Sequence, residues 1–214
     1  MEASFWHEKW KRGEINFHQS EANPLLTVHF EKLTLAKGSR VFLPLCGKTR
    51  DIAWLLASGY RVAGAELSGQ AINELFKELG LAPTISEAGK LTRYSADDID
   101  IWVGDIFDVS AEHLGPINAI YDRAALVALP ADMRKRYASH LMQITGAAPQ
   151  LLISYVYDQS KIDGPPFSVN EDEVRQHYGA AYQLTPVEVK DVAGGLKGKV
   201  ASTETVWLLQ KSNG

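Results

Sequence analysis

Short apolar runs alternate with segments of helical periodicity along most of the chain. Apolar runs that predict strands lie at 41–45, 60–65, 99–103, 117–121 and 150–157. Periodic segments that predict helices lie at 24–33, 49–58, 68–79, 131–144 and 170–178. Around Pro83 to Tyr94 we expect a loop or a short hairpin, and the β-rich runs 183–192 and 203–210 predict a closing antiparallel hairpin.

Strands that alternate with helices predict an α/β fold with a right-handed, mostly parallel sheet. In such sheets, ligands bind outside the carboxyl ends of the strands. Polar or turn residues follow four of the predicted strands at this edge. These residues are Leu45 in its glycine turn, Glu66, Asp105 and the pair Asp122-Arg123.

The turn after the first strand, Leu45-Cys46-Gly47, is followed about 20 residues later by Glu66, a spacing typical of nucleotide-binding α/β units. The turn brings backbone N–H groups to the sheet edge, and the carboxylate suits two vicinal ribose hydroxyls. A triphosphate-binding loop would need glycine at Phe42, and a dinucleotide fingerprint would need further glycines at Leu45 and at Thr49 or Arg50. The pattern therefore predicts an adenosine-containing ligand without a pyrophosphate.

Composition limits the classes of protein that fit. A chain of 214 residues with 45% hydrophobic and 22% charged residues predicts one domain. The net charge of -4 leaves no general basic surface, so we expect no nucleic-acid partner, and Arg134 to Arg136 predicts the solvated face of a helix. No apolar run is long enough to span a membrane. The single cysteine, Cys46, is compatible with the cytoplasm, and we interpret it as structural.

Histidine spacing gives no support for a metal centre. The six histidines show neither an H-x-x-x-H pattern nor Cys/His ligand spacing. Packing or surface roles are the default interpretation for them.

Four segments carry a specific resemblance that spans nearly the whole chain. They are Phe42-Leu43-Pro44-Leu45-Cys46-Gly47-Lys48, Val62 to Ser68, Tyr121-Asp122-Arg123-Ala124-Ala125-Leu126-Val127-Ala128 and Gly164-Pro165-Pro166-Phe167, joined by Trp6 to Trp10 at the N-terminus. Together they resemble the thiopurine S-methyltransferase family, in its bacterial type. The resemblance implies a Rossmann-like, seven-stranded methyltransferase sheet that uses S-adenosylmethionine. It also implies methyl transfer to an aromatic or heterocyclic thiol, with selenium or tellurium species, and hence tellurite resistance, as further candidates.

The resemblance places cofactor contacts at Trp10, Leu45, Glu66 and Arg123, and each position also has a purely structural interpretation. Glu66 could be a solvated acid at a strand end, and Leu45 could simply end a buried strand, although its backbone suits the methionine end of the cofactor. Trp10 either covers the cofactor with its indole or fixes the N-terminal helix to the core, with nearly equal weight.

Arg123 has several candidate partners, because its planar fork suits the cofactor carboxylate, an acceptor anion, or an ion pair with Asp122 or Asp105. Asp105 either contacts adenine or caps the segment after its strand. No catalytic base is evident, in keeping with an in-line displacement that depends on orientation, and only Arg123 is a candidate for positioning the acceptor.

For the acceptor we expect Phe17, the turn around Phe167 and the loop 194–199 to line or cover the site. The alternative is an aromatic core residue and two ordinary surface loops. We expect one domain over 1–214, with residues 1–38 as a helical cover, and a monomer. A halide or thiocyanate methyltransferase and a non-catalytic cofactor-binding module remain the rival interpretations.

Overall fold

The computed structural model describes residues 3–14 and 19–212. The chain forms two compact units, Met1–Ala119 and Ile120–Gly214. The prediction of a single domain over 1–214, with residues 1–38 as a cover, stays a prediction.

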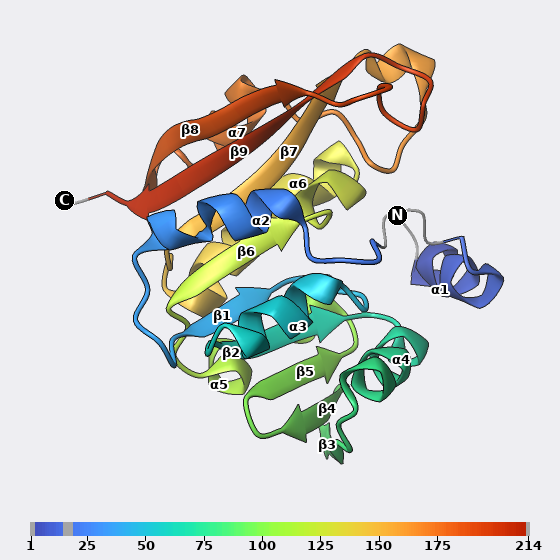
Figure 1. Cartoon of the computed structure of the whole chain (residues 1–214), viewed down its shortest axis with the longest axis vertical. Helices are drawn as coiled ribbons and strands as arrows, with labels where there is room; N and C mark the ends of the chain where they lie inside the picture. The colour runs from blue at the N-terminus through green and yellow to red at the C-terminus, as the bar shows by residue number, and fades with distance from the viewer. Residues whose placement is uncertain (1–2, 15–18, 213–214) are drawn as a thin grey trace. The chain divides into compact units, whose positions relative to one another are not determined.

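The first unit contains a mixed sheet in the strand order β3-β4-β5-β2-β1 (Figure 1). Its strands are β1 (Arg40–Leu43), β2 (Arg61–Glu66), β3 (Thr84–Ala88), β4 (Leu91–Ala96) and β5 (Ile99–Val103). Its helical segments are α1 (Ala3–Arg12), α2 (Pro24–His29), η1 (Phe30–Leu33), α3 (Arg50–Ala57), α4 (Gly69–Leu79), η2 (Ile106–Asp108) and α5 (Ala111–Leu114). Strands β1, β2 and β5 run parallel, whereas β3 and β4 form an antiparallel hairpin on β5.

Helices cover both faces of this sheet. On one face, the Phe76 ring of α4 lies 6.0 Å from the Tyr94 ring of β4. On the other face, the His113 ring of α5 lies 4.8 Å from the Trp102 ring of β5. The two contacts lie on opposite faces because Trp102 pairs with Arg93, the strand neighbour of Tyr94, and successive residues of a strand point to opposite sides.

Helix starts in the first unit follow the capping residues of the sequence. The side chains of Asn23, Thr49 and Ser68 each accept a hydrogen bond from a backbone N–H in the first turn of the helix that follows. Gly80 ends α4 in the left-handed conformation, which glycine adopts without steric cost. The helices predicted over 24–33, 49–58 and 68–79 are thereby confirmed, the first with η1 as its last turn.

The second unit contains strands in the order β6-β7-β9-β8. They are β6 (Ala119–Arg123), β7 (Gln150–Tyr157), β8 (Tyr182–Asp191) and β9 (Ser202–Lys211), with the helical segments η3 (Leu126–Ala128), α6 (Ala131–Thr145), η4 (Gln159–Lys161) and α7 (Glu171–Tyr178). Strands β6 and β7 are parallel, whereas β9 pairs antiparallel with both β7 and β8. The closing antiparallel hairpin is therefore confirmed.

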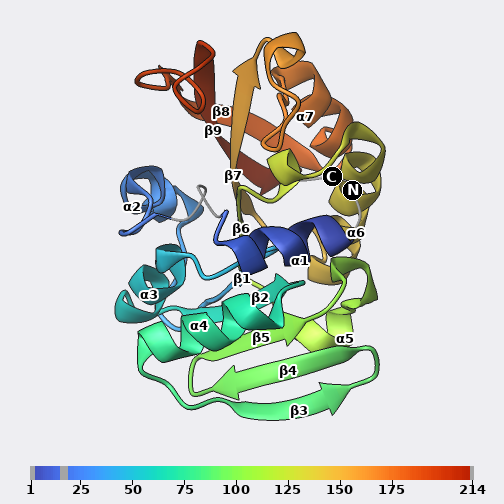
Figure 2. The same ribbon diagram turned by 90° about the vertical axis from the view of Figure 1, so that its right-hand side faces the viewer.

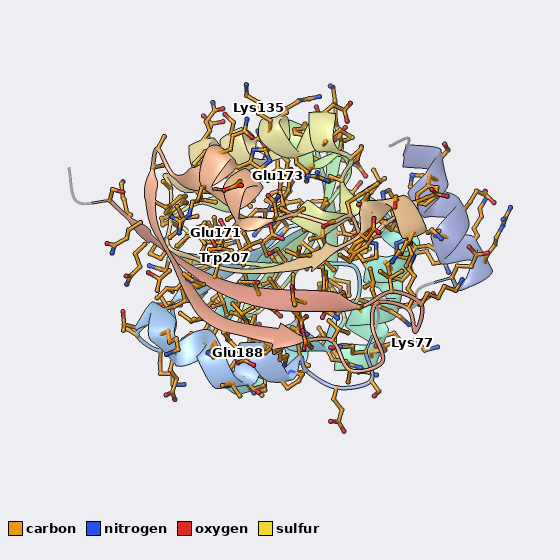
Figure 3. All side chains as sticks on the ribbon, turned by 90° about the horizontal axis from the view of Figure 1, so that it is seen from above. Lys77, Lys135, Glu171, Glu173, Glu188 and Trp207 are labelled. Carbon is orange, nitrogen blue, oxygen red and sulfur yellow. The ribbon has the colours of Figure 1, made fainter. Side chains whose placement is uncertain are left out.

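The basic run at 134–136 is not uniformly solvated. Lys135 and Arg136 are exposed, but Arg134 is only 5% exposed. Its side chain extends from α6 toward α7. Its guanidinium donates to Glu173, labelled on α7 in Figure 3, and to the Leu129 carbonyl oxygen. The expectation of a solvated face is wrong for Arg134, because a planar fork can satisfy a carboxylate and a carbonyl while buried.

The Rossmann-like class is confirmed, but the strand count differs from seven. The described residues contain nine strands, because the segment 84–96, expected as a loop or a short hairpin, forms the β3/β4 hairpin. Gly89 makes the turn of this hairpin at φ +65, in the left-handed region that favours glycine. Leu91 and Tyr94 of β4 are buried, whereas most of β3 is exposed. The segment therefore shows little of the alternation between apolar and polar residues that predicts a strand.

Candidate functional site

The carboxyl ends of β1, β2 and β5 meet at one edge of the first unit. The Cys46 N–H donates to the Ala65 carbonyl oxygen at 2.9 Å, and the Gly104 N–H donates to the Glu66 carbonyl oxygen at 2.9 Å. Glu66 also pairs in register with Val103 of β5. The structure therefore brings together the predicted residues Leu45, Glu66 and Asp105.

The turn between β1 and α3 has an unusual backbone. Leu45 has φ +47 and Gly47 has φ +51, so two of three consecutive residues are left-handed. For leucine this conformation costs roughly 1–3 kcal/mol, and such strain tends to occur at functional sites. Leu45 is half-buried, and its position in this turn agrees with a role through its backbone.

Glu66 is a buried carboxylate held by backbone N–H groups. Its Oε2 accepts from the Gly47 N–H at 2.8 Å and its Oε1 from the Ser68 N–H at 2.9 Å, and the side chain is 6% exposed. Burial raises the pKa of the Glu66 carboxyl, and the backbone hydrogen bonds act in the opposite direction. The alternative of a solvated acid at a strand end is wrong. Glu66 ties the glycine turn to the end of β2.

Asp105 has the capping role that the sequence allowed. Its Oδ1 accepts from the Phe107 N–H at 3.0 Å at the start of η2, and the residue is exposed. Before it, Gly104 has φ +146, and a Cβ there would lie 2.6 Å from Leu91 Cδ2. Glycine is therefore required where the chain leaves β5. A contact between Asp105 and adenine stays a prediction.

Cys46 lies inside the same turn and is buried. Burial, followed by the charge of Glu66, raises the pKa of its thiol well above the usual value. A protonated, enclosed thiol is a poor nucleophile, so the geometry favours the structural interpretation.

Trp10 belongs to α1, which Figure 2 shows beside α4. The residue is 4% exposed, as expected if it fixes the helix to its surroundings. A hollow of about 520 Å³ lies between α1 and the start of α4. It is lined by Ser4, His7, Glu8, Lys11, Ser68, Gly69 and Gln70. Contact of the Trp10 indole with a cofactor stays a prediction.

Arg123 ends β6 in the second unit, and Asp122 precedes it. Asp122 is fully buried, and its carboxylate accepts from the Leu126 N–H at 3.0 Å and the Tyr137 hydroxyl at 2.8 Å. Burial raises the pKa of Asp122 to about 6, although its hydrogen bonds lower it. Adjacent strand residues point to opposite faces, so Arg123 points away from the side on which the Asp122 carboxylate meets Tyr137, and the geometry does not favour the alternative of an ion pair between them.

Two segments of the second unit that were expected near the acceptor lie together. Lys197 Nζ, in the loop 194–199, donates to the Pro165 carbonyl oxygen at 2.7 Å. The Phe167 ring packs on Gly164, where a Cβ would lie 2.7 Å from Phe167 Cδ1, and the Arg134 guanidinium lies 5.8 Å from the ring centroid. A substrate contact for Phe167 stays a prediction, and Phe17 lies outside the described residues.

Sequence reasoning missed two polar side chains on the same face as Arg123, Tyr155 of β7 and Glu204 of β9. The signal for Glu204 was an acidic residue inside an otherwise apolar and β-branched run. Within the described residues, no group of three His, Cys, Asp or Glu side chains could hold a metal ion. No helix of the described segments is long and apolar enough to cross a membrane.

Solved structures define the class of fold. A S-adenosylmethionine-dependent methyltransferase from Anabaena variabilis aligns with a TM-score of 0.66 at 13% identity, covering 98% of this chain and 95% of that one. The 1,6-didemethyltoxoflavin-N1-methyltransferase of Burkholderia thailandensis, solved with 1,6-didemethyltoxoflavin and S-adenosylhomocysteine, also gives 0.66, at 15% identity over 98% of this chain and 87% of that one. The chain has the fold of S-adenosylmethionine-dependent methyltransferases.

Sequence comparison then defines the family. The family model described as Thiopurine S-methyltransferase (TPMT) matches residues 1–212. Proteins named thiopurine S-methyltransferase from Xanthobacter autotrophicus and Teredinibacter turnerae are each 54% identical over 99% of this chain, covering 100% and 99% of their own lengths. One from Pseudomonas paraeruginosa is 44% identical over 99% of this chain and 100% of its own. The chain belongs to the thiopurine S-methyltransferase family and is a methyltransferase that uses S-adenosylmethionine.

Proposed function

We propose that the chain transfers a methyl group from S-adenosylmethionine to the sulfur of aromatic and heterocyclic thiols, thiopurines among them. The observation that carries this proposal is the 54% identity, over nearly full length, to relatives named for that reaction. The site at the strand ends of the first unit also supports the proposal, because a hydrogen bond there joins Glu66 to the Leu45–Gly47 turn.

The residues of the first unit fit the cofactor. A carboxylate offers about four acceptor sites, and the backbone of Gly47, Ser68 and Leu67 does not use all of those on Glu66. The remaining capacity suits the ribose hydroxyls. We assign the methionine end to the Leu45 backbone and adenine to Asp105. Trp10, in the N-terminal segment 1–38, would cover the site and exclude water.

When bound, S-adenosylmethionine would supply an activated methyl group, which an acceptor thiolate would take in line as the bond to the sulfonium sulfur breaks and S-adenosylhomocysteine leaves. The displacement needs alignment more than acid–base chemistry, and orientation alone can contribute about 7–11 kcal/mol. We assign acceptor positioning to Arg123, whose Nε is buried without a hydrogen-bond partner among residues 3–14 and 19–212. A guanidinium in that state suits a thiolate or a ring nitrogen.

Selenium and tellurium species, with the tellurite resistance they imply, are included as nucleophiles for the same displacement. A monomer in the cytoplasm is supported by the single cysteine and by the scatter of exposed large apolar side chains over separate segments. Those described are Phe5, Val28, Leu81, Ile85 and Val189.

A panel of acceptors tests the proposal. The chain is incubated with S-adenosylmethionine labelled in its methyl group and with a thiopurine, thiocyanate or tellurite, and the labelled products are counted. We expect turnover with the thiopurine. Turnover with thiocyanate alone would support the rival halide or thiocyanate methyltransferase. Binding of S-adenosylhomocysteine without any transfer would support the non-catalytic module.

A further inference from the structure

Three polar side chains lie on one face of the sheet in the second unit. Arg123 of β6 is in register with Ile153 of β7. Tyr155 is two residues further along β7 and therefore on the same face, within the reach of a diagonal neighbour. Glu204 of β9 stands directly opposite Tyr155. The register thus places the phenol of Tyr155 between the guanidinium of Arg123 and the carboxylate of Glu204.

The electrostatics of these groups agree with that placement. Burial raises the pKa of Tyr155, followed by the charge of Glu204 and hydrogen bonding to it, whereas the Arg123 charge lowers the pKa. The hydroxyl therefore stays protonated and serves as a donor to Glu204. Both Tyr155 and Glu204 are half-buried, so neither is fully hydrated.

The cluster has unused hydrogen-bonding capacity. Arg123 Nε is buried and has no acceptor in the part of the chain that the structure describes. Lys190 of β8 stands opposite Glu204, but its ammonium lies 3.7 Å from the Glu188 carboxylate. The phenol of Tyr155 thus lies between a donor without an acceptor and the carboxylate to which it donates.

Apolar side chains adjoin the cluster. Tyr155 packs against the buried group Tyr157, Leu196 and Val200, with Ile162 beside it. Leu196 lies in the loop that Lys197 joins to the Gly164–Phe167 turn. The polar groups therefore lie at the border of an apolar patch that includes Leu196, from the loop expected near the acceptor. Apolar walls with a few polar groups are the usual composition of a small-molecule site.

We propose that Arg123, Tyr155 and Glu204 form the polar wall of the acceptor site and select heterocyclic thiols. Arg123 donates to the thiolate or to a ring nitrogen, and Glu204 accepts from a ring N–H. Tyr155 is a positioning residue that orients the Glu204 carboxylate. A heterocyclic thiol with a ring N–H matches this pairing, whereas benzenethiol does not. This inference rests on the proposed function, because it names the acceptors of the same site.

The test compares Glu204→Gln and Tyr155→Phe with wild type on a thiopurine and on benzenethiol, both with saturating S-adenosylmethionine. For Glu204→Gln we expect kcat/KM for the thiopurine to fall about tenfold to a hundredfold, mainly through KM, because a hydrogen bond to a charged group is lost. For Tyr155→Phe we expect a fall of about threefold to tenfold. Values for benzenethiol should stay within about twofold. Glu171→Gln, at an exposed residue of α7, is the matched control.

Affinity for S-adenosylhomocysteine, measured by calorimetry, should be unchanged in every variant. Equal losses for both acceptors, or no loss for either, would overturn the inference while leaving S-methylation intact. If wild type methylates neither thiol, the proposed function fails and this inference fails with it. Should Glu204→Gln not fold, Tyr155→Phe decides the matter alone, because it keeps the ring and removes only the hydroxyl.

Discussion

At the scale of single residues, the best-defined feature is the way Glu66 is used. Each of its carboxylate oxygens accepts a hydrogen bond from a backbone N–H group, one in the glycine turn and one at the start of α4. In our proposal the carboxylate therefore has two roles. It stabilises the conformation of the turn, and its remaining lone pairs accept hydrogen bonds from the ribose. Buried charges of this kind are tolerated because hydrogen bonds replace hydration.

Replacing Glu66 by alanine should weaken cofactor binding strongly. We expect affinity for S-adenosylhomocysteine to fall about tenfold to a hundredfold, because hydrogen bonds to a charged group are lost and the Gly47 N–H loses its acceptor. Calorimetry measures the change, with Glu87→Ala on the exposed strand β3 as the control. Unchanged affinity in Glu66→Ala would refute the ribose contact.

Arg123→Lys should separate the two roles that the sequence left open. Lysine keeps the positive charge but lacks the planar fork. If Arg123 positions the acceptor, kcat for a thiopurine falls by about tenfold while affinity for S-adenosylhomocysteine stays the same. A loss of that affinity instead would assign Arg123 to the cofactor carboxylate.

Asp122 should make stability depend on pH. Its pKa is about 6 in the folded chain and about 4 in an unfolded one, so between these values the folded state binds more protons. The free energy of unfolding should therefore fall as pH rises from about 4 to about 6, by about 3 kcal/mol from this group.

Asp122→Asn removes that contribution because the amide stays neutral. Denaturant unfolding at a series of pH values should show wild type losing stability relative to Asp122→Asn across the window from about 4 to about 6. Asp132→Asn, at an exposed position on α6, should follow wild type. Parallel curves for wild type and Asp122→Asn would contradict the assignment.

At the scale of elements, the site depends on close packing between β2, β5 and the turn after β1. Gly64 of β2 is the contact point, since a Cβ there would lie 2.5 Å from Ile101 Cδ1 and 3.0 Å from Cys46 Sγ. The absence of a side chain lets the neighbouring strand and the turn approach β2. The backbone positions of Leu45 and Glu66 follow from that approach.

Gly64→Ala should therefore cost about 1–3 kcal/mol of unfolding free energy, through overpacking. Adding Ile101→Val should recover part of the loss, because it removes the methyl group that meets the new Cβ. Chemical denaturation measures both. Gly69→Ala is the control, since its Cβ would meet only Val103 Cγ1 at 3.7 Å, and no loss is expected there. An unchanged free energy of unfolding in Gly64→Ala would contradict the close packing at this position.

At the scale of the whole molecule, the candidate groups divide between the two compact units. Glu66, Leu45, Asp105 and Trp10, assigned to the cofactor, belong to the first unit, whereas Arg123 and Phe167 belong to the second. Because one fold serves many activities, the choice of acceptor depends on the side chains of the site and not on the fold.

Ligand binding should stabilise the whole chain by mass action. At a concentration of about 100 times its Kd, S-adenosylhomocysteine should raise the free energy of unfolding by about 2.7 kcal/mol. Thermal unfolding followed at increasing ligand concentration tests this. The shift should shrink in Glu66→Ala at the same concentration, and an equal shift in both chains would place the ligand elsewhere.

The sequence by itself determined the helices and strands whose signals are local. The helices capped by Asn23, Thr49 and Ser68 begin within one residue of the starts predicted at 24, 49 and 68, and the strand 150–157 has the predicted bounds. It also placed Glu66 and the glycine turn at strand ends. These features depend on neighbours within a few residues, so periodicity and capping chemistry suffice to find them.

Only the tertiary structure decided how distant segments pair. It selected the β3/β4 hairpin over a loop, buried Arg134 against Glu173, directed Glu66 to the Gly47 N–H and set Tyr155 opposite Glu204. Strand register and burial depend on which segments meet, and a single sequence carries little local signal for that choice. A polar residue in a strand can face solvent or a buried partner, and a shift of one residue reverses the outcome.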